Sequence, residues 1–144
     1  MISDRHTISE VRVRYAETDQ MGIVYHTHYL VWCEVGRTDY IRALGTTYAE
    51  IEREGIVLAV ADVRIRYVAP ARYDDRIRIR TWLERVQSRA VTFGYELTRA
   101  NGEDGARIAT ATIKLIALDA SGSPCLLPAS LVRRFHEDTP APHH

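Results

Sequence analysis

The chain has 144 residues, of which 46% are hydrophobic and 26% are charged, and its formal net charge is zero. This length and composition predict one folded domain over residues 1–144 with a single core, and they exclude a disordered chain. A neutral chain has no long-range field to attract nucleic acid or an anionic membrane, so neither is an expected partner. No apolar run reaches the roughly 18 residues of a membrane span, and no signal peptide is recognisable, so we expect no integral membrane segment and a cytoplasmic location.

The first predicted element is a strand over about residues 8–16, in which Val11, Val13 and Tyr15 alternate with arginines. After a turn, apolar residues recur at steps of three and four, which predicts an amphipathic helix from Thr27 to Leu44. The chain therefore begins with a strand, a loop and a long helix.

Gly36 lies in the middle of the apolar stripe of that helix, where glycine costs about 1 kcal/mol relative to alanine. A very close approach of the helix to a sheet would offset this cost, so we expect the helix to be central and enclosed. Gly45 is a typical helix stop, and residues 46–55 are expected to add one or two further helical turns.

Four strands are predicted after the helix, because apolar and polar residues alternate over residues 56–69, 77–83, 91–98 and 107–118. The turns between them, such as that at residues 101–105, are too short for crossovers, so the strands should pair antiparallel. This order predicts an α+β domain in which an antiparallel sheet wraps around one long helix.

The strands at residues 8–16 and 56–69 are expected at the sheet edges, and a long apolar edge strand requires a partner. Pairing of two chains through residues 57–63 would provide one, so a homodimer is expected. The Pro-rich tail at about residues 137–144 is expected to be frayed.

The two cysteines, Cys33 and Cys125, lie far apart without a Cys-x-x-Cys spacing, so both are interpreted as free thiols, and Cys33 as a core residue. His26 and His28 lack a third ligand at a recognisable spacing, so no metal site is predicted. The sequence has no Gly-x-Ser-x-Gly elbow, phosphate-binding loop or dinucleotide fingerprint.

Candidate chemistry gathers in the loop before the long helix, where Asp19 and His26 lie. In one interpretation Asp19 completes a turn and His26 is a residue near the helix cap. In the other, the helix N-terminus stabilises a developing oxyanion, Asp19 activates water or attacks a carbonyl, and His26 orients the reactants. Those are the parts of a hydrolase that has no Ser or Cys nucleophile.

Glu34 is a rival carboxylate on the helix. Its spacing from Arg37 predicts a modest ion pair, yet an acid facing a pocket could act as the base in place of Asp19.

The segment from Val11 to Gly45 resembles the signature of hotdog-fold acyl-CoA thioesterases of the 4-hydroxybenzoyl-CoA thioesterase family, especially the branch associated with the Tol-Pal system. The pattern that carries the resemblance is specific, and its residues are Tyr15, Asp19, Gly22, Tyr25, His26 and Tyr29. The resemblance implies a hotdog fold with a five-stranded sheet, and an acyl-CoA thioesterase that releases a free acid and coenzyme A. It implies no metal or redox cofactor, since coenzyme A is part of the substrate.

Carried over by position, the resemblance makes Asp19 the catalytic carboxylate and makes His26 and Tyr15 residues that assist it. Gly22 and Tyr25 would contact the substrate, and backbone N–H groups near Tyr25 and His26 would hold the thioester carbonyl. The chain departs from the family at Gln20 and Met21, which predicts a pocket shaped for a different acyl group.

The resemblance also implies that active sites form at a dimer interface, commonly with two dimers in a tetramer. Val57 and Val60 of the partner's long strand would then line the acyl pocket. Arg64, Arg66 and Arg89 are candidates for the coenzyme A phosphates on the basis of charge and position.

Two alternatives use the same fold. A hydratase or dehydratase acting on acyl thioesters would also use a histidine and a carboxylate, but would release no thiol. A non-catalytic acyl-CoA-binding module would bind the thioester and leave it intact.

Overall fold

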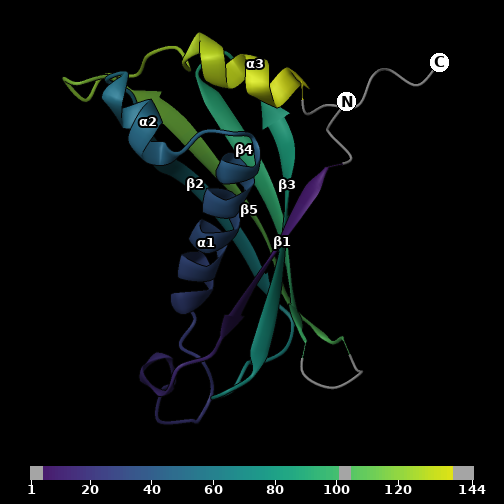
Figure 1. Cartoon of the computed structure of the whole chain (residues 1–144). Helices are drawn as coiled ribbons and strands as arrows, with labels where there is room; N and C mark the ends of the chain where they lie inside the picture. The colour runs from purple at the N-terminus through teal and green to yellow at the C-terminus, as the bar shows by residue number, and fades with distance from the viewer. Residues whose placement is uncertain (1–4, 101–104, 138–144) are drawn as a thin grey trace.

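The structure, a computed structural model, describes residues 5–100 and 105–137. In chain order its elements are β1 (His6–Arg12), the 3-10 turn η1 (Tyr15–Glu17), α1 (His28–Ala43), α2 (Tyr48–Arg53), β2 (Val57–Tyr67), β3 (Arg76–Val86), β4 (Ala90–Arg99), β5 (Arg107–Leu118) and α3 (Ala129–Glu137). Helix α1 runs along one face of the sheet, and the loop before it lies at the lower end of the molecule in Figure 1.

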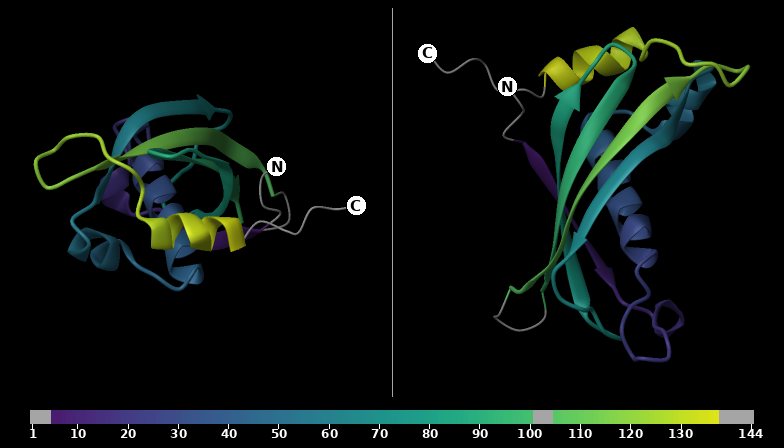
Figure 2. Two further views of the ribbon diagram at one scale, coloured as in Figure 1. Left: turned by 90° about the horizontal axis from the view of Figure 1, so that it is seen from above. Right: turned by 180° about the vertical axis from the view of Figure 1, so that it is seen from behind.

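The five strands form one sheet in the order β1-β3-β4-β5-β2, and every neighbouring pair is antiparallel. The sheet curves around α1, as the view from above shows (Figure 2). The predicted α+β class, the antiparallel pairing and the edge positions of the first and second strands are all confirmed.

Helix α1 packs very closely on the sheet, mainly against β1 and β3. Its predicted range, Thr27 to Leu44, is confirmed to within a residue at each end. A Cβ atom placed on Gly36 would overlap Thr81 Oγ1 and would lie 2.9 Å from Cγ2 of Ile79. The absence of a side chain at Gly36 is therefore what allows the helix to pack against β3, as the sequence predicts.

The first strand ends earlier than predicted, at Arg12 instead of Ala16. The backbone of Val13 still pairs with Asp74 and Asp75, but the N–H of Arg14 donates to the carboxylate of Glu17 at 2.7 Å. The Glu17 side chain thus accepts the hydrogen bond that a partner strand would otherwise accept, and the backbone leaves the sheet and enters η1. Alternation through Tyr15 did not reveal the change, because a capping contact leaves no mark on the hydrophobic pattern.

Helix α3 is not among the predicted elements. Leu131 and Phe135 are four residues apart on its buried face, and the Phe135 ring packs against Phe93 with 6.3 Å between centroids. This spacing is a helical signal, although it is carried by two residues in a short segment. The helix closes the end of the core opposite the loop (Figure 1).

Two predicted features, the turn at residues 101–105 and the frayed tail, lie wholly or mostly outside the described residues. None of the helices in the described part of the chain is long and apolar enough to cross a membrane.

Candidate active site

A cleft of about 420 Å³ opens at the N-terminal end of α1. Its walls come from the loop before α1, the first turn of α1 and the end of β2; they are formed by Asp19, Ile23, Val24, Tyr25, His26, Tyr29, Tyr67, Val68, Ala69 and Pro70. The structure thus brings the predicted Asp19, Tyr25 and His26 together around one largely apolar space.

Asp19 holds a tight turn and also borders the cleft. Its Oδ1 accepts the N–H of Met21 at 2.8 Å, and its carbonyl accepts the N–H of Gly22 at 3.0 Å. Gly22 has a φ of +80°, a left-handed conformation that glycine adopts without a steric cost. The other carboxylate oxygen of Asp19, Oδ2, accepts no hydrogen bond from the described residues and is available to a substrate or water.

The same turn occurs a second time in the chain, at Asp119. There Oδ1 accepts the N–H of Ser121 at 2.9 Å, the carbonyl accepts the N–H of Gly122 at 2.9 Å, and Gly122 has a φ of +83°. Asp119 does not line the cleft. The turn alone therefore does not indicate a functional aspartate. Asp19 differs from Asp119 in that it lines the cleft.

The start of α1, which borders the cleft through His26 and Tyr29, has backbone N–H groups without acceptors among the described residues. Thr27 is the N-cap residue and makes no capping bond with its side chain. Among the described residues, no acceptor is found for the N–H groups of His26 and Thr27, whereas the N–H of Tyr25 donates to the Glu17 carbonyl at 2.9 Å. Of the N–H groups expected to bind a carbonyl near Tyr25 and His26, that of Tyr25 is already paired, and those of His26 and Thr27 stay candidates.

Tyr67, at the end of β2, was not predicted as a site residue. Its hydroxyl donates to the backbone carbonyl of His26 at 2.9 Å, and its ring lies edge-on to the imidazole with 6.3 Å between centroids. The sequence pattern shows Tyr67 only as one apolar position of an alternating strand. No local signal indicates that its hydroxyl reaches a residue 41 positions away.

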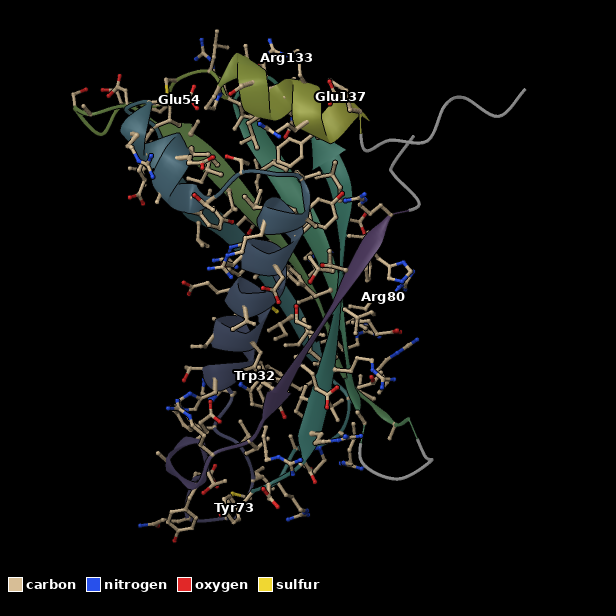
Figure 3. The ribbon with its side chains drawn as sticks, in the orientation of Figure 1. Trp32, Glu54, Tyr73, Arg80, Arg133 and Glu137 are labelled. Carbon is tan, nitrogen blue, oxygen red and sulfur yellow. The ribbon has the colours of Figure 1, made fainter. Side chains whose placement is uncertain are left out.

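Tyr15 lies apart from this cleft. Its side chain is 77% exposed, and its ring packs edge-on against Tyr73 with 5.7 Å between centroids. Figure 3 shows Tyr73 at the lower tip of the molecule. Tyr15 is therefore not among the residues that line the cleft, and its assisting role stays a prediction.

The predicted substrate-binding residues of the strands are also separate from the cleft. Val57 and Val60 are exposed on the half of β2 farther from Tyr67. Arg64 lines a different hollow together with Arg66 and Trp82, and Arg89 lies in the connection between β3 and β4, near the segment that leads into α3. Within one chain, none of these side chains lines the cleft that Asp19 borders.

The rival groups on α1 do not reach the cleft either. Glu34 is exposed and Arg37 is buried, and no ion pair within 4.0 Å joins them in the described structure. Cys33 is a buried core residue as predicted, and burial raises the pKa of its thiol to about 12, so it is no nucleophile. Within residues 5–100 and 105–137, no group of three or more His, Cys, Asp or Glu residues could hold a metal ion.

Comparison with known proteins gives a consistent result. The family model described as thioesterase-like superfamily matches residues 13–135. YneP of Bacillus subtilis is 46% identical over 94 residues, covering 65% of this chain and 68% of that protein. The acyl-CoA thioesterase YbgC of Haemophilus influenzae is 30% identical over 128 residues, covering 88% of this chain and 91% of that protein.

Solved structures agree with these sequence matches. A DHNA-CoA thioesterase from Staphylococcus aureus superposes with a TM-score of 0.83 at 34% identity, covering 92% of this chain and 87% of that chain. A 4-hydroxybenzoyl CoA thioesterase superposes with a TM-score of 0.82 at 19% identity, covering 91% and 99%, and shows likeness of fold alone. The predicted resemblance and the predicted hotdog fold are both confirmed.

Proposed function

The chain belongs to the thioesterase-like superfamily, and from this premise we propose that it hydrolyses an acyl-CoA thioester to the free acid and coenzyme A. The observation that carries the proposal is that the Asp19 carboxylate and the uncapped start of α1 border the same cleft. A carboxylate and unpaired N–H groups on one apolar cavity are what acyl transfer requires.

In the proposed reaction, the thioester carbonyl oxygen accepts hydrogen bonds from the N–H groups of His26 and Thr27. The dipole of α1 favours the negative charge that this oxygen acquires as the carbonyl carbon becomes tetrahedral. The imidazole of His26, which lines the same cleft, orients the thioester or the attacking water.

Asp19 acts by one of two balanced routes. As a general base, its Oδ2 takes a proton from water while the water oxygen bonds to the carbonyl carbon; the C–S bond then breaks, and the proton passes to the sulfur of the departing coenzyme A. As a nucleophile, Oδ2 bonds to the carbonyl carbon while the C–S bond breaks and coenzyme A leaves as the thiolate, which takes up a proton; water then cleaves the resulting anhydride to the free acid and the Asp19 carboxylate. After a single turnover in ¹⁸O-labelled water, label in Asp19 identifies the second route, because water that attacks the Asp19 carbonyl of the anhydride leaves its oxygen there.

The proposal includes a homodimer, with two dimers associating as a tetramer. Strand β2 is an edge of the sheet, and its exposed apolar side chains are Val57, Val60, Val63 and Tyr67. Pairing β2 with its copy would cover them and would bring the partner's Val57, Val60 and Arg64 toward the cleft. Roles for these residues, for Arg89, Gly22 and Tyr15, and a cytoplasmic location, remain predictions.

The test is release of free thiol from a panel of short-chain, long-chain and aromatic acyl-CoAs. Asp19→Asn keeps the side-chain acceptor of the turn and removes the base, so we expect turnover to fall by at least about a hundredfold. Asp119→Asn is the matched control, because it makes the same change in the same kind of turn away from the cleft, and it should retain wild-type turnover.

Other outcomes identify the alternatives. Conversion of a hydroxyacyl-CoA without thiol release would indicate a hydratase or dehydratase, and tight binding without conversion would indicate an acyl-CoA-binding module. Wild-type turnover in a folded Asp19→Asn variant would remove Asp19 from the reaction.

A further inference from the structure

A second carboxylate lies two residues before Asp19 and plays no part in the chemistry proposed above. Glu17 is only 3% exposed, belongs to η1 and does not line the cleft. A buried carboxylate is costly unless hydrogen-bond donors or cations surround it. Its contacts therefore indicate what it holds in place.

The Glu17 carboxylate joins the loop to α1. Oε1 accepts the N–H of Arg14 at 2.7 Å, and Oε2 accepts the indole N–H of Trp32 at 3.3 Å. Oε2 also lies 3.6 Å from the Arg14 guanidinium and 4.0 Å from Nδ1 of His28. Figure 3 shows Trp32 beside the lower turns of α1, the end at which the loop lies.

The backbone of Glu17 makes the matching contact on the other side of the loop. Its carbonyl accepts the N–H of Tyr25 at 2.9 Å, directly before the two unpaired N–H groups at the start of α1. A single residue is thus bonded to the chain that enters the loop, to the chain that leaves it, and to the body of the helix.

The loop beyond Glu17 is closed upon itself. Thr18 forms a bridge with Val24, and the N–H of Asp19 donates to the Ile23 carbonyl at 2.9 Å. The returning side of the loop is held by the β2–β3 connection, where the N–H of Val24 donates to the Ala71 carbonyl at 2.8 Å. Ile23 also forms a bridge with Arg72 there. Glu17 holds the entering side, so its contacts contribute to the position of the Asp19 carboxylate relative to the start of α1.

We propose that Glu17 is a positioning residue, which fixes Asp19 relative to the start of α1 through Trp32 and Tyr25. This inference rests on the proposed function. A carboxylate suits the position because it offers acceptors on two sides, toward the backbone N–H of Arg14 and toward the indole N–H of Trp32. Glutamine has the same shape but must turn an NH₂ group toward one of these donors.

The experiment compares Glu17→Gln with Glu96→Gln, using the acyl-CoA that the wild type hydrolyses best. Glu96 is a suitable control because its carboxylate pairs with Arg107 at 2.8 Å away from the cleft. A displacement of about 1 Å at a reacting group costs on the order of a hundredfold in rate. We expect kcat of Glu17→Gln to fall between tenfold and a hundredfold with KM within about threefold, and kcat of Glu96→Gln to stay within twofold of wild type.

A spectroscopic measurement tests the contact itself. The chain has two tryptophans, so a Trp82→Phe background leaves Trp32 as the only indole emitter. Adding Glu17→Gln to that background should shift the Trp32 emission, because the N–H loses its charged acceptor. Unchanged emission would show that the contact is absent in solution and would overturn the proposal.

The kinetic outcomes distinguish a failure of the proposed Glu17 role from a failure of the thioesterase proposal. Wild-type kcat in a folded Glu17→Gln variant overturns the role of Glu17 and leaves the thioesterase proposal intact. If the wild type releases thiol from no acyl-CoA, both fall together. If Glu17→Gln does not fold, Trp32→Phe removes the donor while Glu17 stays: a lowered kcat at unchanged KM supports the positioning role, and a wild-type kcat overturns it.

Discussion

Asp19 combines a turn contact with a place in the wall of the cleft. Its Oδ1 accepts the N–H of Met21 in the turn, and the residue lines the cleft. The same turn at Asp119 shows that the turn contact needs no cleft. The proposed chemical role of Asp19 is therefore tested only by a substitution that keeps the turn, as Asp19→Asn does.

Tyr67 gives a second prediction at the scale of single residues. Its hydroxyl donates to the carbonyl of His26, so it holds the peptide whose N–H belongs to Thr27. Tyr67→Phe keeps the ring and removes this bond, and we expect kcat to fall about tenfold through loss of positioning. Steady-state kinetics beside Tyr73→Phe, an exposed tyrosine that lies outside the cleft, checks this. Equal rates in both variants would show that the bond does not matter.

At the scale of elements, the position of the cleft depends on how closely α1 packs on the sheet. Gly36 allows contact with Ile79 and Thr81, and this contact fixes where the N-terminus of the helix lies. The stripe spacing predicts the helix, and the glycine predicts the close approach. Helix propensity alone would disfavour glycine at this position.

Gly36→Ala tests that packing. The added methyl group overlaps Thr81 Oγ1, and overpacking of this kind costs about 1–3 kcal/mol, against a gain of about 1 kcal/mol in helix propensity. We expect a net loss of up to about 2 kcal/mol in the free energy of unfolding, measured by urea titration. Adding Thr81→Ala to the Gly36→Ala chain removes the overlapping oxygen and should recover part of the lost free energy of unfolding. A Gly36→Ala chain more stable than wild type would contradict the packing argument.

At the scale of the whole molecule, β2 is an edge strand with apolar side chains exposed to solvent. Sedimentation is expected to give two or four times the chain mass of 16.4 kDa. Val63→Lys introduces a charge near the proposed contact and should shift the protein toward the monomer. Leu126→Lys, an equivalent change at an exposed loop residue, should not. A monomeric wild type would exclude the shared-site proposal.

Two buried ionisable groups of the core are expected to lower the stability of the fold at alkaline pH. Burial raises the pKa of Cys33 to about 12 and the pKa of Tyr48 to about 12. In the unfolded chain these groups ionise near their ordinary values of about 8.5 and 10, so above about pH 9 the unfolded state binds fewer protons than the folded state. The free energy of unfolding should then fall as pH rises from about 9 toward 12, while these groups add no pH dependence below about pH 8.

Calorimetric Tm values across this range check the prediction. Cys33→Ala should flatten the early part of the decline, because it removes the group that ionises first. A Tm that stays level up to about pH 11 would show that these groups ionise equally easily in the folded state.

The sequence by itself determined the elements and the family of this protein. The periods of its apolar residues define α1 and the strands, and the spacing from Tyr15 to Tyr29 marks the loop that carries Asp19 and His26. Periodicity and motif spacing are local properties, so the chain displays them before it folds. Helix α3 was missed because only two buried residues in a short segment carry its period.

Only the tertiary structure decided which residues share the cleft. It brought Tyr67 to the carbonyl of His26, placed Glu17 beneath α1, and turned Tyr15 away toward Tyr73. These contacts join residues on different elements, or depend on a side chain replacing a strand partner, and neither leaves a periodic trace in the sequence. A hydrogen bond depends on distance and direction in space, which become fixed when the sheet curves around the helix.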